Sequence, residues 1–136
     1  MSDCTDQTNH LAILIAAPHP GETAMSNDLT AMAQALLARG FTADEILCLR
    51  GWLDRPRMVA FLQAAGQRVA SWTDSSVFLH VSGHGFFTGA TVEDARPGLL
   101  FEESAEADDD GHLFWSDLFA ALALPAGVRL TLLPDL

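Results

Sequence analysis

Short apolar runs that alternate with amphipathic stretches are the feature of this sequence that most constrains its fold. Leu11–Ala17, Glu45–Leu49 and Val77–Val81 each have the length of one strand, and the first is apolar at every position. A run without polar alternation is typical of a strand buried on both faces of a parallel sheet. The order strand, helix, strand, helix, strand therefore predicts a parallel α/β fold with right-handed crossovers.

The two helices between these runs are expected to start and stop at capping residues. Asn27 and Asp28 are expected to open the first helix, which stops at Gly40. Asp54, just ahead of Pro56, is expected to open the second helix, which runs to about Trp72.

The chain after the third run has a looser pattern. Gly98–Phe101 reads as a short strand, Ser116 is placed to cap a last helix through Leu122, and Val128–Leu133 makes a fourth strand that stops at Pro134. Residues 102–111 are strongly acidic and are expected to form an exposed loop.

Size and composition indicate one domain. The chain has 136 residues and 49% hydrophobic content, which is enough for one core. Residues 1–10 are expected to be a polar tail and residues 11–136 the domain. The tail lacks a secretory signal pattern, and nowhere do ~18 apolar residues run together, so we expect a soluble cytoplasmic protein without a membrane span. The two cysteines, Cys4 and Cys48, indicate no disulfide framework.

The negative net charge of the chain restricts the partners that it can bind. The formal net charge is −11, and all seven basic residues are arginines. Such a surface repels phosphate backbones, so we expect no nucleic-acid partner, whereas a basic peptide or basic protein fits the charge.

Three segments are candidates for a functional site because they follow the carboxyl ends of predicted strands: Pro18–Asp28, Ser82–Gly85 and Pro134–Leu136. In the second segment, His84 lies between two glycines that allow a sharp turn and leave the imidazole accessible. An imidazole with a pKa near ~6.5 suits general acid–base chemistry. The alternative is a turn histidine that only hydrogen-bonds locally.

The segment Phe78–Gly85 resembles the catalytic-histidine strand of caspases, metacaspases and related bacterial peptidases. The likeness extends over nearly the whole chain from Leu11 onward. It implies a caspase-like three-layer αβα sandwich with a mostly parallel central sheet, of which the C-terminal part is missing. It also implies a catalytic role for His84 and Gly85, because the oxyanion hole of such an enzyme uses backbone N–H groups near the histidine turn and the nucleophile.

In that family the fourth strand ends in an aspartate, a variable residue and the nucleophilic cysteine. Asp135 and Leu136 reproduce this approach, so the cysteine is expected just after Leu136 and this chain is expected to be inactive alone. Cys4 lies in the tail and Cys48 within an earlier strand, so neither replaces it. A histidine activates such a thiol by favouring its thiolate.

The resemblance to metacaspases also implies a pocket for a basic substrate side chain. The acids of that pocket match Asp28 and Asp135, for which the alternatives are a helix cap and a chain-end turn. True caspases instead hold an acidic residue with arginines, and no arginine occurs between Leu11 and Ala38, where one would be expected.

Metal binding is not expected from the pattern of ligands. If calcium bound, Asp109 and Asp110 would be the first candidates, but the acidic stretch lacks the spacing of an EF-hand, and a solvated loop is favoured. His19 and His112 match no ligand spacing with His84 and are expected to be surface or loop histidines. His80 is expected to be a partly buried, hydrogen-bonded structural residue.

Three hypotheses from different classes follow. The first is a cysteine endopeptidase domain with a His–Cys dyad, and the second is an inactive pseudo-peptidase that binds or regulates. The third is a small α/β enzyme that uses His19 or His84 for metal or phosphate chemistry, although no Gly-rich phosphate loop is present. We also expect a partner, either a C-terminal remainder or another chain, to cover the edge of the sheet.

Overall fold

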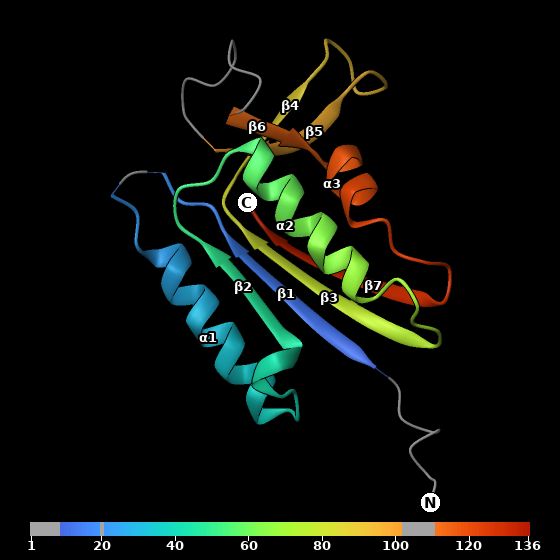
Figure 1. Ribbon diagram of the computed structural model, residues 1–136. Helices are drawn as coiled ribbons and strands as arrows, with labels where there is room; N and C mark the ends of the chain where they lie inside the picture. Colours follow the sequence, from blue (N-terminus) through green and yellow to red (C-terminus); the bar gives the residue numbers. More distant parts are fainter. Residues whose placement is uncertain (1–8, 20, 102–110) are drawn as a thin grey trace, which may run out of the picture.

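The computed structural model describes residues 9–19, 21–101 and 111–136, and its centre is a parallel sheet of four strands. The strands are β1 (His10–Ala16), β2 (Ile46–Arg50), β3 (Ser75–Ser82) and β7 (Val128–Asp135), in the order β2-β1-β3-β7 (Figure 1). Every pairing in this sheet is parallel. The predicted strands are therefore confirmed, with small differences at their ends.

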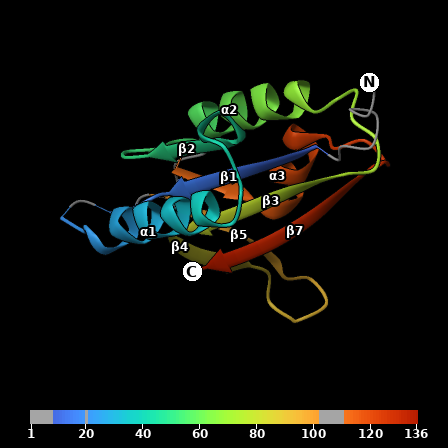
Figure 2. The ribbon, with the colours of Figure 1, turned by 90° about the horizontal axis from the view of Figure 1, so that it is seen from below.

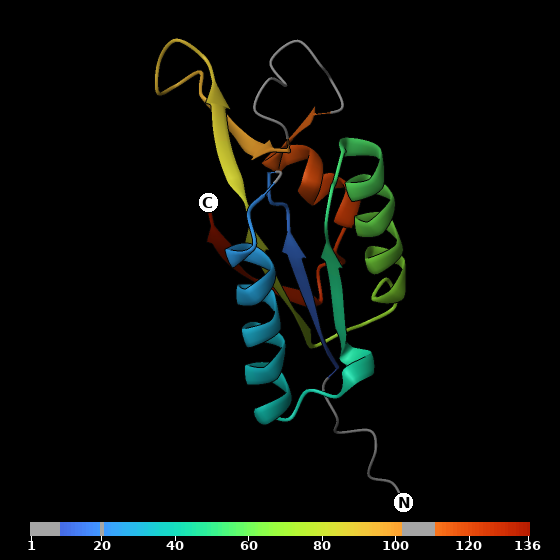
Figure 3. The same ribbon diagram turned by 90° about the vertical axis from the view of Figure 1, so that its left-hand side faces the viewer.

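Helices cover both faces of the sheet, as the three-layer αβα prediction requires. The helices are α1 (Ala24–Ala38), α2 (Arg55–Arg68) and α3 (Trp115–Leu122), and a short 3-10 turn, η2 (Ala43–Glu45), precedes β2. Figures 2 and 3 show α1 on one side of the strands and α2 on the other. In the described ranges no helix has the length and apolar character needed to cross a membrane.

Strand β1 is apolar throughout because it contributes to two cores. Leu11, Ile13 and Ile15 pack in the larger core with residues of α2 and α3. The intervening residues of β1 pack with Leu29 and Leu36 of α1 in the smaller core. All of these β1 side chains are fully buried, which explains the absence of polar alternation.

The helix starts show which capping signals the fold uses. Asp54 caps α2 as predicted, because its carboxylate accepts a hydrogen bond of 2.9 Å from the N–H of Arg57. The prediction for α1 was wrong: the helix begins at Ala24, and Asp28 lies inside it. Ala24 and Met25 have high helix propensity, and Met25 packs against the smaller core, so the helix extends past the expected cap.

A second, smaller sheet stands beyond the carboxyl ends of β1 and β3 (Figure 1). It is antiparallel, in the order β4-β5-β6, and consists of β4 (His84–Thr88), β5 (Arg96–Leu100) and β6 (His112–Phe114). Only β5 was anticipated, since β4 contains a glycine and β6 is very short. This sheet begins with His84 itself, so it fixes the backbone of the candidate site.

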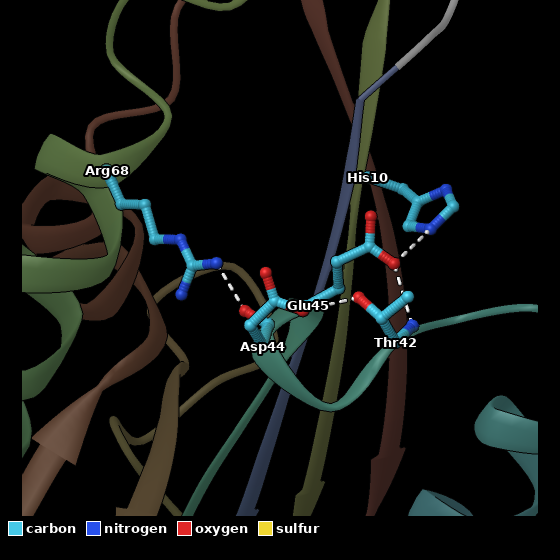
Figure 4. Close-up of polar contacts among 5 residues, drawn as sticks. All are labelled: His10, Thr42, Asp44, Glu45 and Arg68. Atoms are coloured by element: carbon cyan, nitrogen blue, oxygen red, sulfur yellow. Dashed lines mark hydrogen bonds and ion pairs between the residues drawn. The ribbon is translucent and has the colours of Figure 1, made fainter.

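Polar contacts at the opposite end of the sheet tie three elements together (Figure 4). Glu45 in η2 accepts a hydrogen bond of 2.8 Å from the N–H of Thr42 and lies 3.0 Å from Nε2 of His10 at the start of β1. Arg68 at the end of α2 donates to the carbonyl of Asp44. These contacts stabilise the amino ends of β1 and β2, at the end of the sheet that is far from the candidate site.

Candidate functional site

The carboxyl ends of β1, β3 and β7 meet at one place. The N–H of Ala17 donates to the carbonyl of Ser82 at 2.9 Å, and the N–H of Gly83 donates to the carbonyl of Asp135 at 3.1 Å. A Cβ built on Gly85 would lie 3.3 Å from the side chain of Leu136. The three segments that the sequence singled out are therefore neighbours in space.

His84 is held by a carboxylate that the sequence did not single out. Its Nε2 lies 2.8 Å from Oε1 and 3.1 Å from Oε2 of Glu22. Glu22 also accepts a hydrogen bond of 2.6 Å from the N–H of His19. The bond with His84 has the largest effect on the pKa of Glu22, followed by the bond from the N–H of His19, and both lower this pKa below its ordinary value. Glu22 is thus a charged partner for the imidazole at neutral pH.

The accessibility of His84 suits proton transfer. Its side chain is 35% exposed, and that of Glu22 is 38% exposed. Nε2 is occupied by Glu22, and none of the described residues hydrogen-bonds Nδ1. The ring can therefore be oriented through one nitrogen while the other exchanges a proton.

His19 lies in the loop between β1 and α1, as one of the two expected alternatives had it, but it is not a surface residue. His19 is only 7% exposed, because its ring stacks on that of His84 with centroids 3.9 Å apart and an interplanar angle of 26°. Its Nε2 lies 3.4 Å from the carbonyl oxygen of Leu100 in β5. The one signal that could have found it was its place just after the first strand.

A pocket lies beside this cluster, between α1 and the strands β3 and β7. It has a volume of about 550 Å³, and both Asp28 and Asp135 line it. The remaining lining residues are Ala31, Met32, Ala35, His80, Leu133 and Pro134. The structure therefore brings together the two acids that the sequence named, one from the exposed face of α1 and one from the end of β7.

His80 forms part of the wall of this pocket. It is 4% exposed, and its Nδ1 lies 3.1 Å from the carbonyl oxygen of Leu133. A carbonyl can only accept, so Nδ1 carries the proton and Nε2 of the neutral ring is an acceptor. Nε2 is buried and has no hydrogen-bond partner in the described part of the chain. The prediction of a hydrogen-bonded structural histidine is confirmed, although the residue is buried rather than partly buried, and its position in the pocket was missed.

The remaining residues named from the sequence lie elsewhere. Cys48 is a free cysteine in the middle of β2. The residue is exposed, but partial burial of its thiol raises the pKa, which does not favour a thiolate. The carbonyl of His112 in β6 accepts a hydrogen bond of 3.1 Å from Arg55. Cys4, Asp109 and Asp110 lie outside the described residues.

Comparison with known families agrees with this geometry. The family model of the CHAT domain matches residues 3–133. The chain belongs to the CHAT domain family. CHAT domains are related to caspase-like cysteine proteases. The family match therefore supports the caspase-like resemblance of this CHAT domain as a relationship between families. No curated protein matches the chain.

Proposed function

We propose that this CHAT domain carries the histidine side of a caspase-like cysteine endopeptidase site. In this proposal His84 is the general base, and the thiol belongs to the second position after Asp135. The observation that supports it most strongly is the hydrogen bond from Gly83 to Asp135, together with the approach of Leu136 to Gly85. Both contacts support the proposal, because they bring the end of β7 next to the segment that carries His84.

The groups present fit the chemistry of such a dyad. His84 would take the proton of the thiol, the thiolate would attack the scissile carbonyl carbon, and the imidazolium would return the proton to the leaving amine. Glu22, 2.8 Å from Nε2, would stabilise the imidazolium and hold the ring so that Nδ1 faces the thiol. Backbone N–H groups at the start of β4, which includes Gly85, would stabilise the oxyanion.

We propose a basic side chain as the group bound in the neighbouring pocket. Asp28 and Asp135 line it, no arginine does, and the chain carries a formal net charge of −11. The carboxylates of Asp28 and Asp135 supply its acceptors. A guanidinium has five N–H donors, so it could use several of these acceptors together.

The test is covalent labelling of the full polypeptide that contains this domain with an arginine-containing peptide electrophile. The proposal predicts that the labelled residue is a cysteine other than Cys4 and Cys48. Labelling should be lost in His84→Ala and retained in Cys48→Ser. Labelling of Cys48, or labelling that survives His84→Ala, would refute the assignment of the dyad.

A binding module without chemistry is the second candidate, and the pocket itself favours it. The acids of the pocket do not depend on His84, so a basic peptide could bind even without a nucleophile. In this case an arginine peptide should bind without being cleaved, and Asp28→Asn should weaken it. Asp117→Asn, which removes an equal charge from the exposed face of α3, is the matched control and should leave the affinity unchanged.

A further inference from the structure

We propose that His19, Glu22 and His84 form a binding site for a divalent cation of the zinc class. Each side chain offers one ligand atom, and these atoms all lie within 4.8 Å of one another. The inference goes beyond the proposed peptidase function, because it requires no nucleophile and no substrate.

The spacing of the ligand atoms is close to what a metal ion requires. Bonds of about 2.0–2.1 Å in tetrahedral geometry place ligand atoms roughly 3.3 Å apart. Nε2 of His84 and Oε1 of Glu22 are already 2.8 Å apart. The longest spacing in the cluster has to shorten by at most roughly 1.5 Å, which a small rotation of side chains can supply.

The ligands are also held in place by contacts outside the cluster. The carbonyl oxygen of Leu100 lies 3.4 Å from Nε2 of His19, and such a contact leaves Nδ1 of that ring as the atom with a lone pair. A carbonyl that accepts from the second ring nitrogen is the usual support of a metal-bound histidine. Stacking at 3.9 Å aligns the His19 and His84 rings, and the N–H of His19 holds Glu22 at 2.6 Å.

The chemistry of the ligands selects the class of cation. Two imidazoles and one carboxylate with a fourth position open to solvent suit Zn²⁺ and, by the usual order of affinities, Cu²⁺ or Ni²⁺. Ca²⁺ and Mg²⁺ prefer oxygen ligands and should bind weakly or not at all. The carboxylate of Glu22 is the anionic member of the cluster, and it complements the charge of the cation.

Metal binding and the base chemistry of His84 would compete. A cation bound between His84 and Glu22 replaces the proton that they share, so binding should weaken as the pH falls. An imidazole bound through Nε2 keeps its proton on Nδ1, so neither nitrogen can then accept a proton. Occupancy would therefore withdraw His84 from general-base chemistry.

The test is isothermal titration of the tag-free chain with Zn²⁺, alongside Ca²⁺ and, as a spectroscopic probe, Co²⁺. We expect one Zn²⁺ per chain and an affinity at least about tenfold lower in Glu22→Gln and in His19→Gln. His112→Ala, which removes a histidine outside the cluster, should bind as the parent does. Circular dichroism would verify that each variant is folded, and Glu22→Gln changes an exposed residue.

Zn²⁺ affinity that is unchanged in Glu22→Gln, or equal affinity for Ca²⁺, would overturn the site. The labelling experiment of the previous subsection, carried out with EDTA so that no cation occupies His84, is independent of this result. Zn²⁺ binding by this chain, together with no His84-dependent labelling of the metal-free full polypeptide, would refute the peptidase and leave the metal site standing. Labelling of the full polypeptide, together with no Zn²⁺ binding by this chain, would refute the metal site and leave the peptidase standing.

Discussion

Nδ1 of His80 in β3 donates a hydrogen bond of 3.1 Å to the carbonyl oxygen of Leu133 in β7. The two residues face each other in the register of these parallel strands. The same histidine and the same leucine line the pocket with Asp28 and Asp135. The wall of the pocket and the strand that leads to the proposed nucleophile are thus one connected unit.

This bond predicts the tautomer of His80. Nitrogen-15 NMR should show that the neutral form of this imidazole has a protonated Nδ1 and an unprotonated Nε2, because the carbonyl can accept only from Nδ1–H. An arginine-containing peptide that enters the pocket should shift the Nε2 resonance, and the same peptide with norleucine in place of arginine should not. A protonated Nε2 in the neutral ring of the peptide-free protein would contradict the assigned geometry.

The cap of α2 predicts a measurable loss of stability. Asp54→Ala removes the acceptor for the N–H of Arg57 and should lower the free energy of unfolding by about 0.5–2 kcal/mol in urea denaturation. Asp54→Asn keeps an acceptor and should stay close to the parent. The ion pair with Arg57 at 4.0 Å is partly exposed, so equal losses in both variants would mean that its charge matters more than the cap.

The contact between α2 and α3 predicts that Gly66 cannot be enlarged. A Cβ at this position would overlap the carbonyl oxygen of Leu122, which belongs to the backbone of α3 and cannot rotate away. Gly66→Ala should therefore cost about 1–3 kcal/mol in the free energy of unfolding, despite the higher helix propensity of alanine. Gln67→Ala, at the next and exposed position, should change it by less than about 0.5 kcal/mol.

The state of Glu22 predicts a dependence of stability on pH. Its pKa lies below the ordinary value of 4.5 in the folded chain, so the folded state binds this proton less readily than the unfolded state. Its stabilising contribution is therefore complete above about pH 4.5 and is lost as the pH falls through the lowered pKa.

Melting temperatures measured from pH 3 to 7 at low salt would check this dependence. The parent should melt above Glu22→Gln near neutral pH, and the difference should shrink in acid. Glu93→Gln is the matched control, because Glu93 is exposed and makes no hydrogen bond with the described residues. A difference that stays constant from pH 3 to 7 would count against the pairing of Glu22 with His84.

The central sheet could be predicted because its signal is local. Each apolar run records burial on both faces, and the glycines around His84 mark a turn at a strand end. Once the strands are placed, the convergence of their carboxyl ends follows from the parallel topology, which is why Asp28 and Asp135 could be connected before their pocket was seen.

The partners of His84 could not be predicted because they depend on how a loop folds. Glu22 and His19 follow β1 and approach His84 only through the path of the chain ahead of α1, which no periodic pattern records. The early start of α1 was missed for a related reason. Packing of Met25 against the core outweighed the capping preference of Asn27 and Asp28.

The register of β7 against β3 pairs Ser82 with Asp135, and no other described strand adjoins β7. Side chains alternate along a strand, so inserting or deleting one residue between Val128 and Asp135 would exchange inward and outward positions. Such a change would also replace the residue that arrives beside Gly85. The strand therefore acts as a ruler, and the number of residues along it decides which residue reaches the segment Gly83–Gly85.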